Sequence, residues 1–459
     1  LDIREKSFGT RHKLVADALR AVAMVDEAAG RSSAALEKLD RAEAIYDEYA
    51  GKLMTRGSEK QRRANADKLW TFWNRVVSFQ ARSAKDEPKA VELAFRTVLR
   101  NKGRVLDAMA DSLSLVRASP GADDAKLIEK IAENRGMFAQ QVLYRSRVRG
   151  TYTEQEASGN NKEVTAAWLD ALLSRVSTDA EATISLRAEQ LGKARSVTKE
   201  TIAEALPPGA ALVELASYRP FDPKAPADTS LGDPRYAGFV LDHSGQVRTV
   251  ELGAASVIDE AVRKLRKALA TPQGDAKSAG RQLDELVMKP LRAHLRGARV
   301  LYLAPDGALN LVPFGALVDE RGDYLVETLS ITYLTSGREL SRMASTPPAP
   351  RSGSIVIANP EYGSAQGVGA GNTARGGAST VAVDLGRVRF SALPGTAQEA
   401  SSLASVFPDA KVSTGAEATE SRIKGLRGPK VLHVATHGFF IDGSRSAQRG
   451  NRALELDDA

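Results

Sequence analysis

The sequence has 459 residues, of which 42% are hydrophobic and 26% are charged, and its formal net charge is +7. These values are ordinary for a globular protein of two to four domains. Basic residues are interspersed with acidic ones and form no run of five or six, so we expect no nucleic-acid partner. The chain has no cysteine, which excludes disulfides and cysteine metal sites. No apolar run approaches the 18 residues of a membrane helix, so we expect no membrane partner.

Residues 1–196 are expected to form an all-helical region. Apolar side chains recur every three or four residues from Leu14 to Met24 and again over 33–53, as on the buried face of an amphipathic helix. Residues 40–46 resemble the second helix of a tetratricopeptide repeat, although no 34-residue period recurs. The pattern predicts a TPR-like solenoid.

From residue 197 onward, short apolar strands alternate with helices. This alternation predicts a second domain over 197–459, an α/β fold whose mostly parallel sheet is covered by helices. The turn at 242–245 predicts an antiparallel hairpin. Because the runs 299–303, 354–358 and 431–435 are all apolar, we expect them to be parallel strands of one sheet, with their carboxyl ends at one edge.

Polar residues follow each of these three strands. His437 ends the last strand, and histidine is well suited to proton transfer near neutral pH. Gly438 leaves a backbone N–H unobstructed, available to stabilise an oxyanion. Asp306 and Asn359 are candidates for binding substrate, although an aspartate before glycine and an asparagine before proline are more often turn residues. If the strands share a sheet, Asp306, Asn359 and His437 line one crevice.

Two further features argue against a metal or a cofactor. His433 and His437 have the spacing of a helical metal site but lie on a strand, so we expect no metal there. We take His433 as a satisfied core histidine or as one that supports a neighbouring functional residue. The glycine-rich run from Gly363 to Gly377 lacks the spacing of a phosphate loop, so we expect no nucleotide. The surrounding glycine-rich stretch 361–387 is predicted to be a mobile flap or a processing loop near the sheet edge.

Three segments, in this order and spacing, carry a family resemblance. They are Ala304–Leu317, Leu393–Ala400 and Leu432–Phe440, and together they resemble the CHAT family. These are caspase-like cysteine peptidase domains that are often fused to tetratricopeptide repeats. The resemblance covers roughly residues 95–459.

The resemblance implies a cytoplasmic endopeptidase that uses a His–Cys dyad on a protein or peptide substrate, without a cofactor. His437 matches the catalytic histidine of the family, and Gly438 matches the glycine that follows it. In the family the cysteine follows on the next core strand, whereas this sequence contains none. We therefore expect a caspase-like domain that is incomplete at its C-terminus and inactive alone. The alternative is a non-catalytic scaffold, a pseudopeptidase whose helical repeats bind protein.

Overall fold

The chain divides into two compact units, each with its own sheet and core. The first unit comprises Leu1–Ile128 and Thr178–Thr346, and the second comprises Glu129–Ser177 and Pro347–Ala459. The computed structural model describes residues 1–54, 59–83, 87–118, 198–226, 228–345, 352–361, 393–426 and 428–437, with a few isolated positions between 119 and 197. The sequence pattern also predicts helices over 123–147, 161–176 and 179–195, which lie almost entirely outside the described residues. Gly438 and the glycine-rich stretch lie outside them as well.

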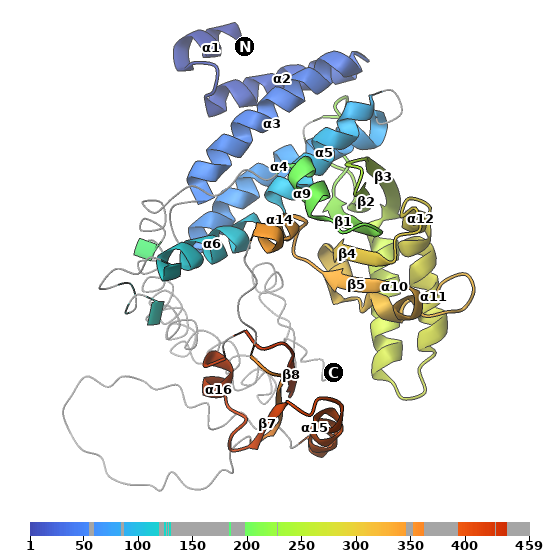
Figure 1. The fold of residues 1–459 in the computed structure, drawn as a ribbon. Helices are drawn as coiled ribbons and strands as arrows, with labels where there is room; N and C mark the ends of the chain where they lie inside the picture. Colours follow the sequence, from blue (N-terminus) through green and yellow to red (C-terminus); the bar gives the residue numbers. More distant parts are fainter. Residues whose placement is uncertain are drawn as a thin grey trace, which may run out of the picture. The chain divides into compact units, whose positions relative to one another are not determined.

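The first unit begins with a layer of helices, and every described element before residue 199 is helical (Figure 1). Helices α1 to α6 are Asp2–Phe8, Lys13–Ala28, Ser32–Met54, Glu59–Ser83, Pro88–Asn101 and Arg104–Ala118. Helix α5 starts with proline, whose missing N–H is no loss at the first helical position. It ends at Lys102-Gly103, where the glycine takes a left-handed backbone conformation with φ +67° and reverses the chain.

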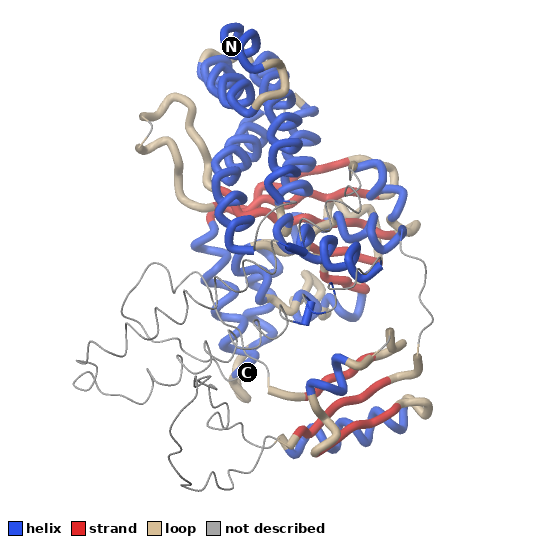
Figure 2. Tube along the Cα trace, turned by 90° about the vertical axis from the view of Figure 1, so that its left-hand side faces the viewer, coloured by secondary structure: helices blue, strands red, loops and turns tan. Residues whose placement is uncertain are grey.

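A five-stranded sheet of order β3-β2-β1-β4-β5 follows. Its strands are labelled in Figure 1, and Figure 2 draws strands in red. These strands are β1 Ala210–Tyr218, β2 Arg235–Asp242, β3 Val247–Ala254, β4 Val300–Ala304 and β5 Ser330–Tyr333. The hairpin predicted around 242–245 is confirmed, because β2 and β3 pair antiparallel across that turn. Strands β1, β4 and β5 are parallel to one another.

Both faces of this sheet are covered. On β1, Leu212 and Ala216 pack into a core shared with the N-terminal helices, whereas Val213 and Leu215 pack into a core on the opposite face. The helices of the first unit that follow α6 are α9 Lys199–Ala205, α10 Ala255–Ala270, α11 Ala276–Leu286, α12 Met288–Arg292, α13 Leu325–Thr328 and α14 Arg338–Ser345. The architecture is thus a helical region followed by a mixed sheet with helices, as the sequence predicts.

The sequence pattern predicts one helix over 279–296, whereas the structure has two, α11 and α12, separated at Val287. The physical reason is Pro290, which has no N–H to donate to the carbonyl of Leu286 four residues earlier and so interrupts the helical hydrogen bonds.

The second unit contains a three-stranded parallel sheet of order β7-β6-β8. Its strands are β6 Ile355–Pro360, β7 Lys411–Gly415 and β8 Leu432–Ala435, and its helices are α15 Pro394–Val406 and α16 Glu420–Lys424. Helix α15 packs its Ala400 against Val356, Ala358 and Ala435, which closes a small core on one face of the sheet.

The prediction that three apolar strands form one sheet is wrong. Strand β4, which contains most of 299–303, belongs to the five-stranded sheet, whereas β6 and β8 belong to the three-stranded one. Strand β4 is already hydrogen-bonded on both sides, to β1 and to β5, so neither edge is free for β6. Apolar composition marks a strand as buried but does not say which strand lies beside it. The prediction of adjacent parallel strands is confirmed for β6 and β8.

Candidate active site

His437 lies two residues beyond the carboxyl end of β8, at the edge of the second sheet where parallel strands commonly present functional groups. The strand is set in register by pairing of Ala435 with Ala358 on β6. Ala435 is buried, and the His437 side chain two positions later is half-buried. A half-buried imidazole at a strand end combines a fixed backbone with access to solvent, which suits a group that exchanges protons with a substrate.

Asn359 lies at the same edge, on the neighbouring strand. It is one residue past Ala358, and its backbone is in the left-handed region with φ 46°, which is uncommon for a residue other than glycine. Its N–H donates to Thr396 Oγ1 at 3.0 Å, and this hydroxyl donates in turn to the carbonyl of Leu393 at 2.7 Å. Thr396 in the first turn of α15 therefore holds the end of β6 in place.

These contacts explain the segment Leu393–Thr396 that carries part of the family resemblance. Pro394 occupies the first helical position of α15, and Thr396 closes the hydrogen bonds between that helix and Asn359. The sequence predicts that Leu393–Thr396 caps a helix running to about residue 406, and α15 confirms it, but the sequence assigns no partner to the Thr396 hydroxyl. The sequence signal for this role is a threonine in the first turn of a helix that starts at proline, where a hydroxyl can bond a nearby backbone group.

His433 lies on the face of β8 that α15 covers, in register with Val356. Its Nε2 is 3.1 Å from Glu399 Oε1, an ion-pair distance without the alignment of a hydrogen bond. The His433 side chain is 29% exposed, so the expected core histidine is only partly buried. Glu399, which sequence reasoning also missed, is the acid that this histidine faces.

Asp306 follows β4 in the first unit, and the backbone already uses its carboxylate. One oxygen accepts from the N–H of Ser217 at 2.7 Å, and the other accepts from the N–H of Gly307 at 2.9 Å. Asp306 thus caps the short 3-10 helix Gly307–Leu311. This is the turn role that the sequence weighs against substrate binding. The predicted crevice required all three residues to follow strands of one sheet. Asn359 and His437 follow strands that pair with each other, whereas Asp306 follows a strand of the other sheet.

The edge formed by β6 and β8 carries His437 but no cysteine nucleophile, because the chain contains no thiol. Among the described residues, no three His, Asp or Glu side chains are grouped as a metal ion would require. Within the same part of the chain, no helix has both the length and the apolar character needed to cross a membrane.

The fold is of the α/β class, with a helical layer in its N-terminal part. His437 follows the end of β8, and α/β proteins commonly carry functional groups beyond the carboxyl ends of their strands. Residues 277–458 match the family model of the CHAT domain. The matched residues include β4 and β5 of the first sheet and all three strands of the second. The family implies a caspase-like fold related to cysteine peptidases. A comparison with curated proteins gave no match.

Proposed function

We propose that the chain is part of a CHAT-type cysteine endopeptidase in which His437 is the general base. The observation that carries this proposal is the position of His437 at the carboxyl end of β8, beside Asn359, within residues that match the family model of the CHAT domain. In a His–Cys dyad the histidine takes the proton of the thiol, and a backbone N–H stabilises the oxyanion that the attack creates. Gly438 is the candidate for that N–H.

The nucleophile of such a dyad has to come from residues outside this chain, since the chain holds no cysteine. The helical layer would then bind a regulatory protein partner, and the enzyme would act on protein or peptide substrates in the cytoplasm. Asn359 is a candidate for contact with the substrate, because its strained backbone is held at the same sheet edge as His437.

The alternative is a non-catalytic scaffold, which the absence of cysteine favours. In that case the caspase-like units would serve only to position the helical layer for protein binding. The two functions differ in one measurable respect, namely whether a protein that extends this chain through the next strand cleaves peptides.

The test is turnover of a panel of fluorogenic peptides by such an extended protein and by the present chain. We expect turnover by the extended protein only, and a loss of at least about a hundredfold for His437→Ala, as removal of a general base entails. His433→Ala is the matched control and should retain most of the activity. Unchanged turnover in His437→Ala would contradict the assignment, and an extended protein that cleaves no peptide would support the scaffold.

A further inference from the structure

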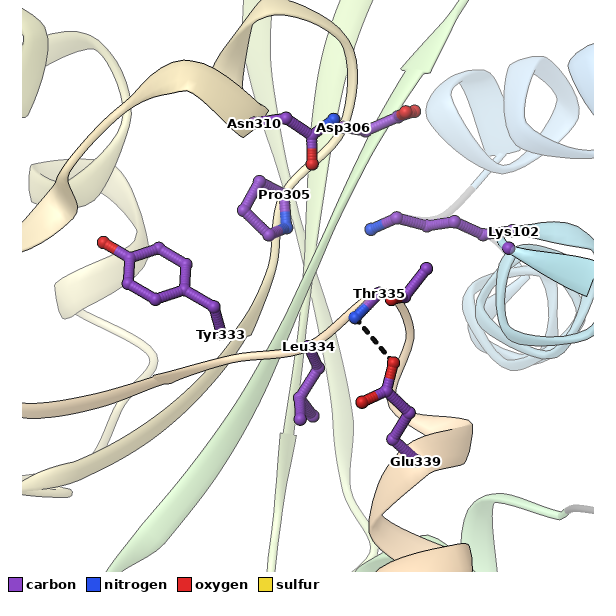
Figure 3. A pocket seen from close by; sticks show the side chains of 9 residues that line it. Lys102, Pro305, Asp306, Asn310, Tyr333, Leu334, Thr335 and Glu339 are labelled. Carbon is purple, nitrogen blue, oxygen red and sulfur yellow. Dashed lines mark hydrogen bonds between the residues drawn. The ribbon is translucent and has the colours of Figure 1, made fainter. Parts of the chain in front are cut away.

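A pocket of about 490 Å³ opens in the first unit at the carboxyl ends of β4 and β5, far in sequence from His437 (Figure 3). Its polar lining consists of Lys102, Asp306, Asn310, Tyr333, Thr335 and Glu339. The volume suits a small ligand or one large side chain, and the carboxyl ends of parallel strands are where open α/β sheets bind ligands.

Lys102 reaches into the pocket, but its amine is already saturated. Lys102 Nζ donates to Glu214 Oε2 at 2.9 Å and to the carbonyl oxygens of Leu215 at 2.9 Å and Ala304 at 2.6 Å. An ammonium group has three N–H donors, and all three are used. The charge of Lys102 is also balanced by Glu214, so the lysine supplies neither a donor nor net positive charge for an anion.

The second basic residue near the pocket is engaged as well. Arg338 donates to the carbonyl oxygens of Arg100 and Lys102 and pairs with Asp107 at 2.6 Å. Burial lowers the pKa of Arg338, as expected for a guanidinium that is held away from water. Asp107 also pairs with Arg342 at 2.8 Å. Neither arginine lines the pocket, so with Lys102 balanced by Glu214 the charge of its lining comes from two carboxylates.

Those two carboxylates, on Asp306 and Glu339, lie on opposite sides of the pocket (Figure 3). Asp306 accepts one backbone hydrogen bond on each oxygen, and Glu339 Oε1 accepts one from the N–H of Thr335 at 2.9 Å. A carboxylate has about four acceptor positions, so both retain unused ones. Asn310 donates its amide N–H to the carbonyl of Gly307 at 3.1 Å and keeps its amide oxygen as a further acceptor.

We propose that this pocket binds the guanidinium group of a ligand, with Glu339 as its principal partner. A guanidinium has only donors and is planar, so it can bond one carboxylate in a bidentate manner and still reach a second acceptor such as Asn310. The source is either a free guanidinium compound or an arginine side chain of a peptide. The site is independent of His437 and goes beyond the proposed peptidase activity.

The test measures binding of L-arginine to the full chain by isothermal titration calorimetry, with L-citrulline as the comparison. Citrulline has nearly the same shape but carries an uncharged urea group in place of the guanidinium. We expect citrulline to bind at least about tenfold more weakly. Equal affinities, or no binding of arginine or of an arginine peptide, would overturn the proposal. An acetylated Gly-Arg-Gly amide separates the sources, since tighter binding than arginine indicates a peptide side chain and weaker binding a free compound.

Three variants locate the site. Glu339→Gln keeps an acceptor for Thr335 but loses the charge, and should weaken arginine binding at least about tenfold. Glu327→Gln is its matched control, because Glu327 Oε1 likewise accepts a backbone N–H, from Tyr324 at 2.9 Å, away from the pocket. Asn310→Asp adds a negative charge and should tighten arginine binding, which keeps the proposal testable if Glu339→Gln fails to fold. Arginine binding that neither Glu339→Gln nor Asn310→Asp alters would refute it.

Discussion

Lys102 and Glu214 form a buried ion pair that joins the helical layer to the first sheet. Their charged atoms are 2.9 Å apart, and the two side chains are 8% and 0% exposed. Glu214 also accepts from the N–H of Gly337, so the pair connects the turn after α5, strand β1 and the start of α14. A buried ion pair adds little net stability, but removal of one partner leaves the other charge buried without compensation.

We therefore predict that Lys102→Met lowers the free energy of unfolding by about 3–5 kcal/mol, because Glu214 stays buried and unpaired. The double variant Lys102→Met with Glu214→Gln should recover part of this loss, since no charge then remains and the glutamine still accepts from Gly337. Urea denaturation of the three proteins measures both values.

Lys199→Met is the matched control for this series. Lys199 pairs with Glu92 at 2.6 Å, but the two side chains are 26% and 52% exposed. An exposed pair contributes at most about 1 kcal/mol, so the control should unfold nearly as the wild type does. If Lys102→Met and Lys199→Met lowered the free energy of unfolding equally, burial of the Lys102–Glu214 pair would have no energetic consequence.

The stability of the first unit should fall at alkaline pH because of buried tyrosines. Tyr218 is 2% exposed and donates to Glu251 at 2.6 Å. Burial raises the pKa of Tyr218 above its usual value of about 10, and the hydrogen bond to the Glu251 carboxylate raises it further by a smaller amount. Above pH 10 the folded state keeps a proton that the unfolded state releases, so stability is lost as the pH rises further, by up to about 1.4 kcal/mol per pH unit.

Tyr218→Phe should make this decline shallower, measured as the urea midpoint between pH 8 and pH 11. Tyr324→Phe is the control, because Tyr324 is 36% exposed and should leave the decline unchanged. An identical pH dependence for wild type and Tyr218→Phe would contradict the prediction.

Gly337 is predicted to tolerate no side chain. A Cβ there would lie 2.4 Å from Cδ2 of buried Leu212 and 3.2 Å from Glu214 Oε1. Gly337→Ala should cost about 1–3 kcal/mol of unfolding free energy, as overpacking of a core does. At Gly232 the nearest atoms would be at an ordinary 3.7 Å, so Gly232→Ala should change stability by less than about 0.5 kcal/mol. Thermal or urea unfolding that ranks the two variants equally would contradict this.

Local signals in the sequence predicted local structure well. The β2–β3 hairpin follows from a turn and two alternating runs that are close in the chain, and the family follows from three motifs in a fixed order. The position of β4 did not follow, because pairing of β4 with β1 joins residues about 90 positions apart. Apolar strands are alike in composition, so sequence alone does not specify their neighbours.

The buried pair of Lys102 and Glu214 shows the same limit for polar residues. They are 112 positions apart, and nothing near Lys102 marks it as buried. Glu214 did carry a signal, since it is a charged residue inside the apolar strand Ala210–Tyr218. A charge in such a place needs a partner, but the sequence does not say which of the 64 lysines and arginines supplies it.

A hydrogen bond from the Asn359 N–H to Thr396 Oγ1 fixes the end of β6, the strand beside β8. Thr396→Val keeps the shape of the side chain but removes the hydroxyl that accepts from the Asn359 N–H. The loss of one such bond is worth about 1 kcal/mol, so the amide of Asn359 should exchange with solvent deuterium about fivefold faster. Thr419→Val is the matched control, because Thr419 Oγ1 accepts from the N–H of Arg422 at 3.2 Å at the start of α16 in the same unit. It should speed exchange at Arg422 and leave Asn359 unchanged. If Thr396→Val leaves exchange at Asn359 as in the wild type, the bond to Thr396 does not hold the end of β6, and its left-handed backbone must be maintained by other contacts.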